Sequence, residues 1–227
     1  MKIGILQPGH APDEVRADLG DYSEMYERLL EGHGFTFGQW YVVDGDFPDG
    51  PEDADAWLIG GSRHGVYEDH DWLPPLEDLV RAIVAAKKPL IGICFGHQVI
   101  AKALGGKVEK FRGGWAVGRT VYDFGDEKLA LNAWHQDQVI ELPEGAQLIA
   151  SNPFCRNAAM VVGDTVLSMQ PHPEYATEML EALFTYRAEV AGVPPEMIDD
   201  ARSRFKEPVD NDAMAGRMAA FFKKGAK

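Results

Sequence analysis

Residues 89–106, PLIGICFGHQVIAKALGG, decide the fold of this chain. The first part, residues 89–93, is short, apolar and uninterrupted, as in a central strand of a parallel sheet that is buried on both faces. Residues 97–104 have the pattern of a helix, which Gly105 and Gly106 end. The stretch therefore predicts a buried strand that turns directly into a helix.

The same alternation occurs on the N-terminal side of this stretch. Strands are expected at residues 2–7, 35–43 and 56–59, and helices at residues 21–33, with Asp21 as N-cap, and 75–87. Alternating strands and helices are typical of an α/β fold with a doubly wound, mostly parallel sheet and helices on both faces.

The pattern changes after residue 107. Five short strands separated by turn residues are expected to be antiparallel and to lie on the sheet or at its edge: residues 118–123, 138–141, 147–150, 159–162 and 165–169. Helices are expected at 175–190, 194–205 and 211–224, where Met214, Met218, Phe221 and Phe222 have helical spacing. We therefore expect one domain over residues 1–180 and a helical extension, 181–227, packed on it.

Composition limits the possible partners and compartments. The 227 residues include 36 acidic and 22 basic side chains, a net charge of −14, which argues against a nucleic-acid surface. No apolar run is long enough to span a membrane, and the N-terminus lacks the layout of a signal peptide. Two cysteines do not make a disulfide framework, so a cytoplasmic location is expected.

Gly92-Ile93-Cys94-Phe95-Gly96 has the layout of a nucleophile elbow with cysteine in the serine position. A sharp strand-to-helix turn needs small residues beside the nucleophile. The start of the helix favours a thiolate, and its free N–H groups can bind an oxyanion. A buried structural cysteine at the end of a strand is the alternative.

A second group of residues follows the last expected strand, in the segment 170–175, QPHPEY. Residues that precede proline are extended, so His172 and Glu174 point to the same side. A carboxylate there can orient the imidazole and leave its other nitrogen free for a nucleophile. A solvated histidine between two prolines is the alternative. Gly60 and Gly61 follow the strand 56–59 and can expose N–H groups, although paired glycines alone are a weak signal.

Together with residues 134–139, WHQDQV, these segments resemble the motifs of class I (triad) glutamine amidotransferases. They are most similar to the stand-alone members, including the γ-glutamyl peptidases, which are similar to the glutaminase domain of GMP synthase. The resemblance implies that Cys94 is the nucleophile, His172 the general base and Glu174 its orienting carboxylate. It also implies an oxyanion hole formed by the N–H groups of Gly61 and Phe95, and a substrate pocket lined by Gly60, Gln98, Trp134 and His135. Two residues depart from the usual pattern, namely Ser62 after the paired glycines and Pro171 before His172.

The implied reaction is cysteine-dependent hydrolysis of a γ-glutamyl amide bond, in glutamine or in a γ-glutamyl peptide or conjugate. It proceeds through a γ-glutamyl thioester on Cys94, with a small-molecule substrate and no metal or organic cofactor. One alternative is a glutaminase subunit that delivers ammonia to a separate synthetase. About fifty residues follow Glu174, too few for a synthetase domain, which favours the free-standing hydrolase. A second alternative is a non-catalytic binding module on the same fold.

Two further features are expected to lie outside this chemistry. His64, Glu68, Asp69, His70 and Asp71 could bind a cation, but their spacing matches no standard metal motif, and a solvated acidic loop near the site entrance is favoured. Cys155 has no elbow pattern around it, and it is predicted to be a packing residue.

Overall fold

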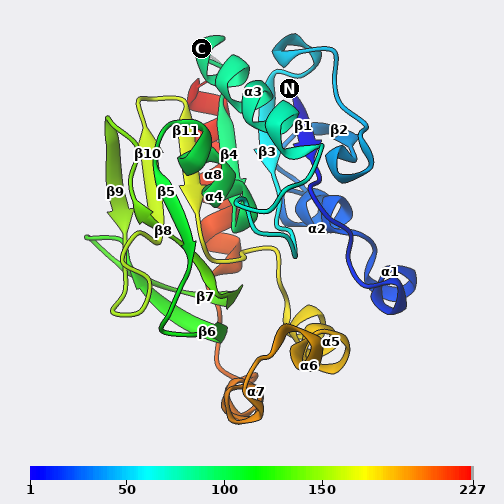
Figure 1. The fold of residues 1–227 in the computed structure, drawn as a ribbon, viewed down its shortest axis with the longest axis vertical. Coiled ribbons are helices and arrows are strands. Elements are labelled where there is room, and N and C mark those ends of the chain that lie inside the picture. The colour runs from blue at the N-terminus through cyan, green and yellow to red at the C-terminus, as the bar shows by residue number, and fades with distance from the viewer. Residues whose placement is uncertain (226–227) are drawn as a thin grey trace.

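The computed structural model describes residues 1–225 and contains a seven-stranded sheet in the order β2-β1-β3-β4-β11-β10-β9 (Figure 1). Strands β2, β1, β3, β4 and β11 are parallel to one another. At one edge, β10 pairs antiparallel with β11, and β9 pairs antiparallel with β10. Two further antiparallel pairs, β5-β8 and β6-β7, lie outside the sheet. The strands are β1 (Lys2–Leu6), β2 (Thr36–Trp40), β3 (Ala56–Ile59), β4 (Leu90–Ile93), β5 (Lys107–Lys110), β6 (Ala116–Asp123), β7 (Lys128–His135), β8 (Asp137–Glu141), β9 (Ala146–Ala150), β10 (Ala159–Val162) and β11 (Val166–Met169).

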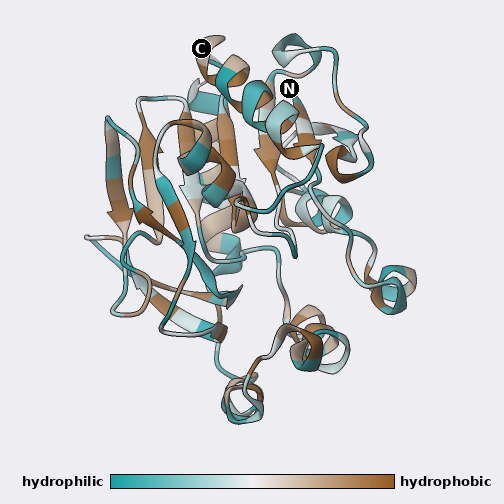
Figure 2. Ribbon diagram, in the orientation of Figure 1, coloured by the Kyte–Doolittle hydropathy of each residue, from teal (hydrophilic) through white to brown (hydrophobic). Residues whose placement is uncertain are grey.

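Helices cover both faces of the sheet. They are α1 (Asp13–Leu19), α2 (Tyr22–Leu29), α3 (Leu73–Ala85), α4 (Phe95–Ala103), α5 (Thr177–Tyr186), α6 (Ala188–Ala191), α7 (Pro195–Ser203) and α8 (Asn211–Gly225), with short 3-10 turns η1 (Val42–Asp44) and η2 (Pro51–Asp53). Side chains alternate between the faces along each strand. Leu58 and Ile91 pack in a core with α2, α5 and α8, while Trp57, Ile59 and Leu90 pack in a second core with α3 and α4. The central strands β3 and β4 are accordingly buried along their whole length, and they are mainly hydrophobic in Figure 2.

The fold class expected from the sequence is confirmed, but one strand runs in the direction opposite to that expected. Residues 165–169 were expected to form an antiparallel strand, and instead β11 lies inside the sheet, parallel to β4 and antiparallel to β10. A tight turn joins β10 to β11, so these two strands run in opposite directions. It is β10 that runs against the parallel strands, and β11 runs with them.

Helix α1 and strands β5 and β7 were not expected from the sequence. Helix α1 has seven residues, a proline N-cap without a side-chain cap and one buried residue, Val15, so it carries almost no amphipathic pattern. In β7, five consecutive residues are buried, which removes the alternation that marks a half-buried strand. By contrast, Asp21 caps α2 as expected, and its capping box includes Glu24.

The C-terminal helix α8 packs on the main core through Met214, Met218 and Phe222, which are fully or nearly fully buried, and Phe221 packs there while partly exposed. The division into a domain over 1–180 and an extension over 181–227 stays a prediction, and residues 226 and 227 of that extension lie outside the described residues. No helix among residues 1–225 is long and apolar enough to cross a bilayer.

A glycine permits the close approach of α4 to the end of β3. A Cβ atom on Gly96 would lie 2.1 Å from the carbonyl oxygen of Ile59, and the Gly96 N–H donates to the carbonyl of Gly60 at 3.1 Å. Because the obstructing atom belongs to the backbone, a larger residue can be accommodated only if the helix moves.

We therefore predict that Gly96→Ala lowers the free energy of unfolding by about 3 kcal/mol or more, through overpacking. Gly216→Ala, inside α8, is the control, because nothing lies within 4 Å of its added methyl group. It should raise stability by about 0.5–1 kcal/mol through helix propensity. Denaturant unfolding measures both, and equal effects of the two substitutions would contradict the packing argument.

Candidate active site

Cys94 occupies the junction between β4 and α4. Its φ of 54° and ψ of −103° place it in a region that L-residues rarely adopt, so the backbone is strained there. Its N–H donates to the carbonyl of Met169 on the neighbouring strand at 2.8 Å. A Cβ atom on Gly92 would lie 2.5 Å from the carbonyl oxygen of Gly96, so the turn requires a glycine before the cysteine. This geometry is that of a nucleophile elbow.

His172 follows β11, the strand beside β4. Its backbone N–H donates to the carbonyl of Asn132 on β7 at 2.8 Å, and its ring stacks on Tyr175 with centroids 4.0 Å apart and planes at 4°. Its Nδ1 donates to Glu174 Oε1 at 2.7 Å. Both side chains are almost fully buried, so the carboxylate fixes the orientation of the imidazole.

The thiol and the imidazole meet at the same end of the sheet. A Cβ atom on Gly61 would lie 3.0 Å from His172 Cε1 and 3.9 Å from Cys94 Cβ, so one glycine touches both groups. Nε2 of His172 has no hydrogen bond of good geometry in the described chain. Burial lowers the pKa of His172, but Cys94 and Glu174 together outweigh it and raise the pKa to about 10. The imidazole of His172 is therefore protonated at neutral pH.

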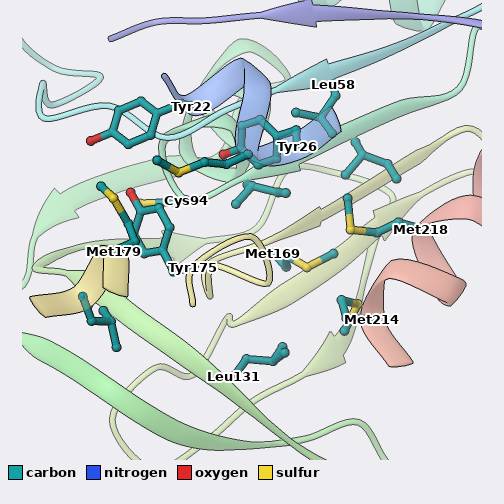
Figure 3. Packing of buried hydrophobic residues seen from close by; sticks show 14 of the residues in the cluster. Tyr22, Tyr26, Leu58, Cys94, Leu131, Met169, Tyr175, Met179, Met214 and Met218 are labelled. Carbon is teal, nitrogen blue, oxygen red and sulfur yellow. The ribbon is translucent and has the colours of Figure 1, made fainter. Parts of the chain in front are cut away.

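Tyr26, on α2, contacts both Glu174 and the glycine loop. Its hydroxyl donates to Glu174 Oε1 at 2.8 Å and accepts from the Gly61 N–H at 3.1 Å. Figure 3 shows Tyr26, Tyr22 and Tyr175 in the buried cluster that also contains Cys94. Burial, followed by the charge of Glu174, holds the pKa of Tyr26 well above its usual value, so the hydroxyl stays a donor.

The N–H groups of Phe95 and Gly61, the two expected oxyanion donors, differ in whether they already form a hydrogen bond. Phe95 is the first residue of α4, where helix geometry leaves its N–H without an intrahelical acceptor. The Gly61 N–H is bonded to Tyr26 and must leave that hydroxyl before it can bind an oxyanion. The oxyanion hole formed by Gly61 and Phe95 therefore stays a prediction.

The other expected site residues line this region with varied roles. A Cβ atom on Gly60 would lie 2.8 Å from a ring carbon of Tyr26, so no side chain fits at this position. Gln98 is buried and donates to the carbonyl of Asp137 and to Gln170 Oε1, both at 3.0 Å, so its amide protons are already bonded. Contact between Gln98 and a substrate stays a prediction.

Trp134 and His135 lie at the end of β7, close to the residue that pairs with His172. The Trp134 ring packs between Trp115 and Phe184, at 5.3 and 5.9 Å between centroids. Burial and then His172 lower the pKa of His135 to about 3, so its ring is neutral. Its Nε2 is buried without a hydrogen-bond partner among the described residues. A role for either residue in substrate binding stays a prediction.

Sequence reasoning gave no site role to Tyr26, Tyr175 or Asn132. The spacing of Tyr26 is that of any buried helical residue, and its partners are 35 and 148 positions away. No local pattern could have identified it. Cys155 was expected to be a packing residue, and it is 1% exposed; burial, and then Cys94, raise the pKa of its thiol to about 12, so it is a poor nucleophile.

Known proteins of similar sequence and structure indicate the family of this chain. Residues 50–185 match the family model "Glutamine amidotransferase class-I". Gamma-glutamyl peptidase 3 of Arabidopsis thaliana is 30% identical over 93% of this chain and 92% of its own length. GMP synthase [glutamine-hydrolyzing] of Pyrobaculum aerophilum is 35% identical over 54% of this chain and 25% of its own length. The crystal structure of a glutamine amido transferase from Methylobacillus flagellatus has a TM-score of 0.79 at 23% identity, and the alignment covers 100% of this chain and 95% of that one. The chain belongs to the class I glutamine amidotransferase family.

Proposed function

We propose that this protein hydrolyses a γ-glutamyl amide bond with Cys94 as nucleophile, His172 as general base and acid, and Glu174 as orienting carboxylate. The observation that carries the proposal is the meeting of a strained cysteine and a carboxylate-bound imidazole around Gly61. A structural cysteine would not need a positive φ, which costs of order 1–3 kcal/mol.

The reaction follows from these groups. The Cys94 thiolate attacks the γ-carbonyl carbon, and the oxyanion that forms is held by the N–H groups of Phe95 and Gly61. Each such donor contributes about 2.7–4 kcal/mol to transition-state stabilisation. As the C–N bond breaks, His172 donates its proton from Nε2 to the leaving amine. Water then attacks the γ-glutamyl thioester, His172 takes the proton of that water, and glutamate leaves as the Cys94 thiolate is restored.

We propose a γ-glutamyl peptide or conjugate as the substrate in preference to glutamine alone. The likeness to gamma-glutamyl peptidase 3 extends over nearly the whole of both chains, whereas the likeness to GMP synthases covers 54–69% of this chain and 25–33% of theirs. The likeness to GMP synthase supports an alternative, in which this protein is a glutaminase that supplies ammonia to a separate synthetase.

A substrate panel of glutamine, γ-glutamyl dipeptides and glutathione, scored for glutamate release, tests the proposal. We expect γ-glutamyl peptides to be turned over faster than glutamine. Cys94→Ser should lower turnover at least about 10³-fold, because only binding and oxyanion contacts remain. Cys155→Ala is the control and should leave turnover unchanged.

The outcomes separate the candidate functions. Glutamine turnover that needs an added synthetase would favour the subunit alternative, and substrate binding without any turnover would favour a binding module. Turnover that survives Cys94→Ser would contradict the mechanism.

Glu174→Gln should shift the alkaline limb of the kcat/KM profile to lower pH. His172 must be protonated to donate to the leaving amine, so activity is lost as pH rises through its pKa, which is about 10 in the wild type. Removal of the Glu174 charge lowers that pKa, and we expect kcat to fall by roughly 10²–10⁴-fold. Steady-state kinetics over the neutral and alkaline range measures both effects. Glu178→Gln, at an exposed position of α5, is the control and should change neither.

Tyr26→Phe should lower both stability and kcat. A hydrogen bond to a buried carboxylate is lost, which should reduce the free energy of unfolding by about 1.5–3 kcal/mol, and Glu174 loses the contact that positions it. Tyr122→Phe is the matched control, because that buried hydroxyl has no partner in the described chain, and its removal should be neutral or stabilising. If the two variants behave alike in unfolding and in kcat, Tyr26 has no positioning role.

A further inference from the structure

The loop between β3 and α3 brings three metal-binding atoms together. His64 Nδ1, Glu68 Oε2 and His70 Nε2 all lie within 4.8 Å of one another. Glu68 Oε2 lies 3.2 Å from His64 Nδ1 and 2.7 Å from His70 Nε2. Ligands of a tetrahedral zinc ion, each about 2.0–2.2 Å from the metal, are separated by roughly 3.4 Å. The His64–Glu68 separation is close to this value, the His70–Glu68 separation is about 0.7 Å shorter, and the two histidine nitrogens lie within 4.8 Å, so one ion would require small adjustments of the side chains.

We propose that His64, Glu68 and His70 form a site for a divalent transition-metal ion such as Zn²⁺, and that the ion clamps the loop of residues 62–72. Two imidazoles and one carboxylate suit Zn²⁺ and its neighbours, whereas Mg²⁺ and Ca²⁺ prefer oxygen ligands. The inference goes beyond the proposed function, because the site uses none of the residues assigned to hydrolysis.

Contacts within and around the loop hold these ligands in place before any ion binds. The His64 and His70 rings pack edge to face with centroids 4.3 Å apart, and His70 stacks on Trp72 at 5.4 Å and 12°. A turn closed by the Glu68 N–H and the Gly65 carbonyl at 3.0 Å returns the chain towards His64. Ligands that are already positioned by packing lose little conformational entropy on binding.

The loop is also tied to the body of the protein at two points. The Tyr67 hydroxyl donates to the Asp137 carboxylate at 2.9 and 3.0 Å. Lys102 Nζ, on α4, donates to the carbonyl of Val66 at 2.5 Å. The segment that carries the three ligands therefore has a defined position on the surface.

The surroundings favour a cation with open coordination positions. A cavity of about 670 Å³ beside the loop is lined by His70 together with Asp44, Asp69 and Asp71. Three protein ligands leave at least one position of a tetrahedral ion for water. His64 and Glu68 do not line this cavity, so its acidic residues add negative charge on the His70 side of the site.

The site lies next to the catalytic elements. The Trp72 ring, which supports His70, contacts Phe95 with centroids 5.7 Å apart. The His64 N–H donates to Ser62 Oγ at 3.1 Å, and Ser62 follows Gly61. An ion held by this loop would therefore restrain a segment that begins beside Gly61 and ends against Phe95.

Sequence spacing did not predict this site, because His-x3-Glu-x-His is not a standard motif, and a solvated acidic loop was favoured. The competing explanation is that Glu68 only accepts a hydrogen bond from each imidazole. The two explanations differ in whether the protons at His64 Nδ1 and His70 Nε2 are displaced by a metal.

Calorimetric titration of the full chain with Zn²⁺, checked by metal analysis after dialysis, tests the proposal. The titration uses the Cys94→Ser background, so that the catalytic thiolate does not bind the ion. We expect one equivalent of Zn²⁺ and no binding of Mg²⁺ under the same conditions. His70→Ala and Glu68→Gln should each weaken Zn²⁺ binding at least about 10-fold. His33→Ala, which alters a histidine far from the loop in sequence, should bind as the parent does.

Hydrogen–deuterium exchange provides a readout that does not depend on activity. Zn²⁺ should increase amide protection over residues 62–72 in the parent, and this increase should be lost in His70→Ala. Absence of binding, or Zn²⁺ affinity that is unchanged in both His70→Ala and Glu68→Gln, would overturn the proposal. Since neither experiment measures hydrolysis, failure here and failure of the proposed function are distinguishable.

Discussion

The parallel pairing of β4 with β11 is the constraint on which the site depends. Ile93 lies opposite Met169, and the Cys94 N–H continues the ladder to the Met169 carbonyl at 2.8 Å. The residues that follow both strands therefore leave the sheet at the same end, where open α/β sheets place their sites. Cys94 and His172 are 78 positions apart in sequence, and this register alone brings them to one edge.

Close backbone packing maintains the strained cysteine. An isolated residue with the φ and ψ of Cys94 would relax, but β4 holds it on one side and α4 on the other. Gly92 allows β4 and α4 to approach, and Gly96 allows α4 to approach the end of β3, to distances that a Cβ atom would prevent. The strain at Cys94 is thus balanced by the burial of β4 and α4 in the core, where the cost of moving either element is high.

The charges of the site form one buried network. Glu174 receives hydrogen bonds from both His172 and Tyr26, and burial without such partners would be costly for a carboxylate. The Tyr26 hydroxyl also accepts the hydrogen bond of the Gly61 N–H, the group that we propose as an oxyanion donor. One side chain therefore connects the carboxylate beside His172 with the glycine loop at Gly61.

The sequence by itself determined the alternation of strands and helices and the elbow around Cys94. It also placed His172 beside Glu174, but the expected extended backbone between them is wrong: residues 172–175 form a turn, closed by the Tyr175 N–H and the His172 carbonyl at 3.3 Å. The alternation and the elbow depend on hydrophobic period and on glycine, whose effects are local. Only the tertiary structure decided the direction of β11, the contact of Tyr26 with Glu174 and the meeting of His64 with His70 around Glu68. Strand partners and side-chain contacts between distant or irregular segments are set by packing of the whole chain, which leaves no periodic signal in the sequence.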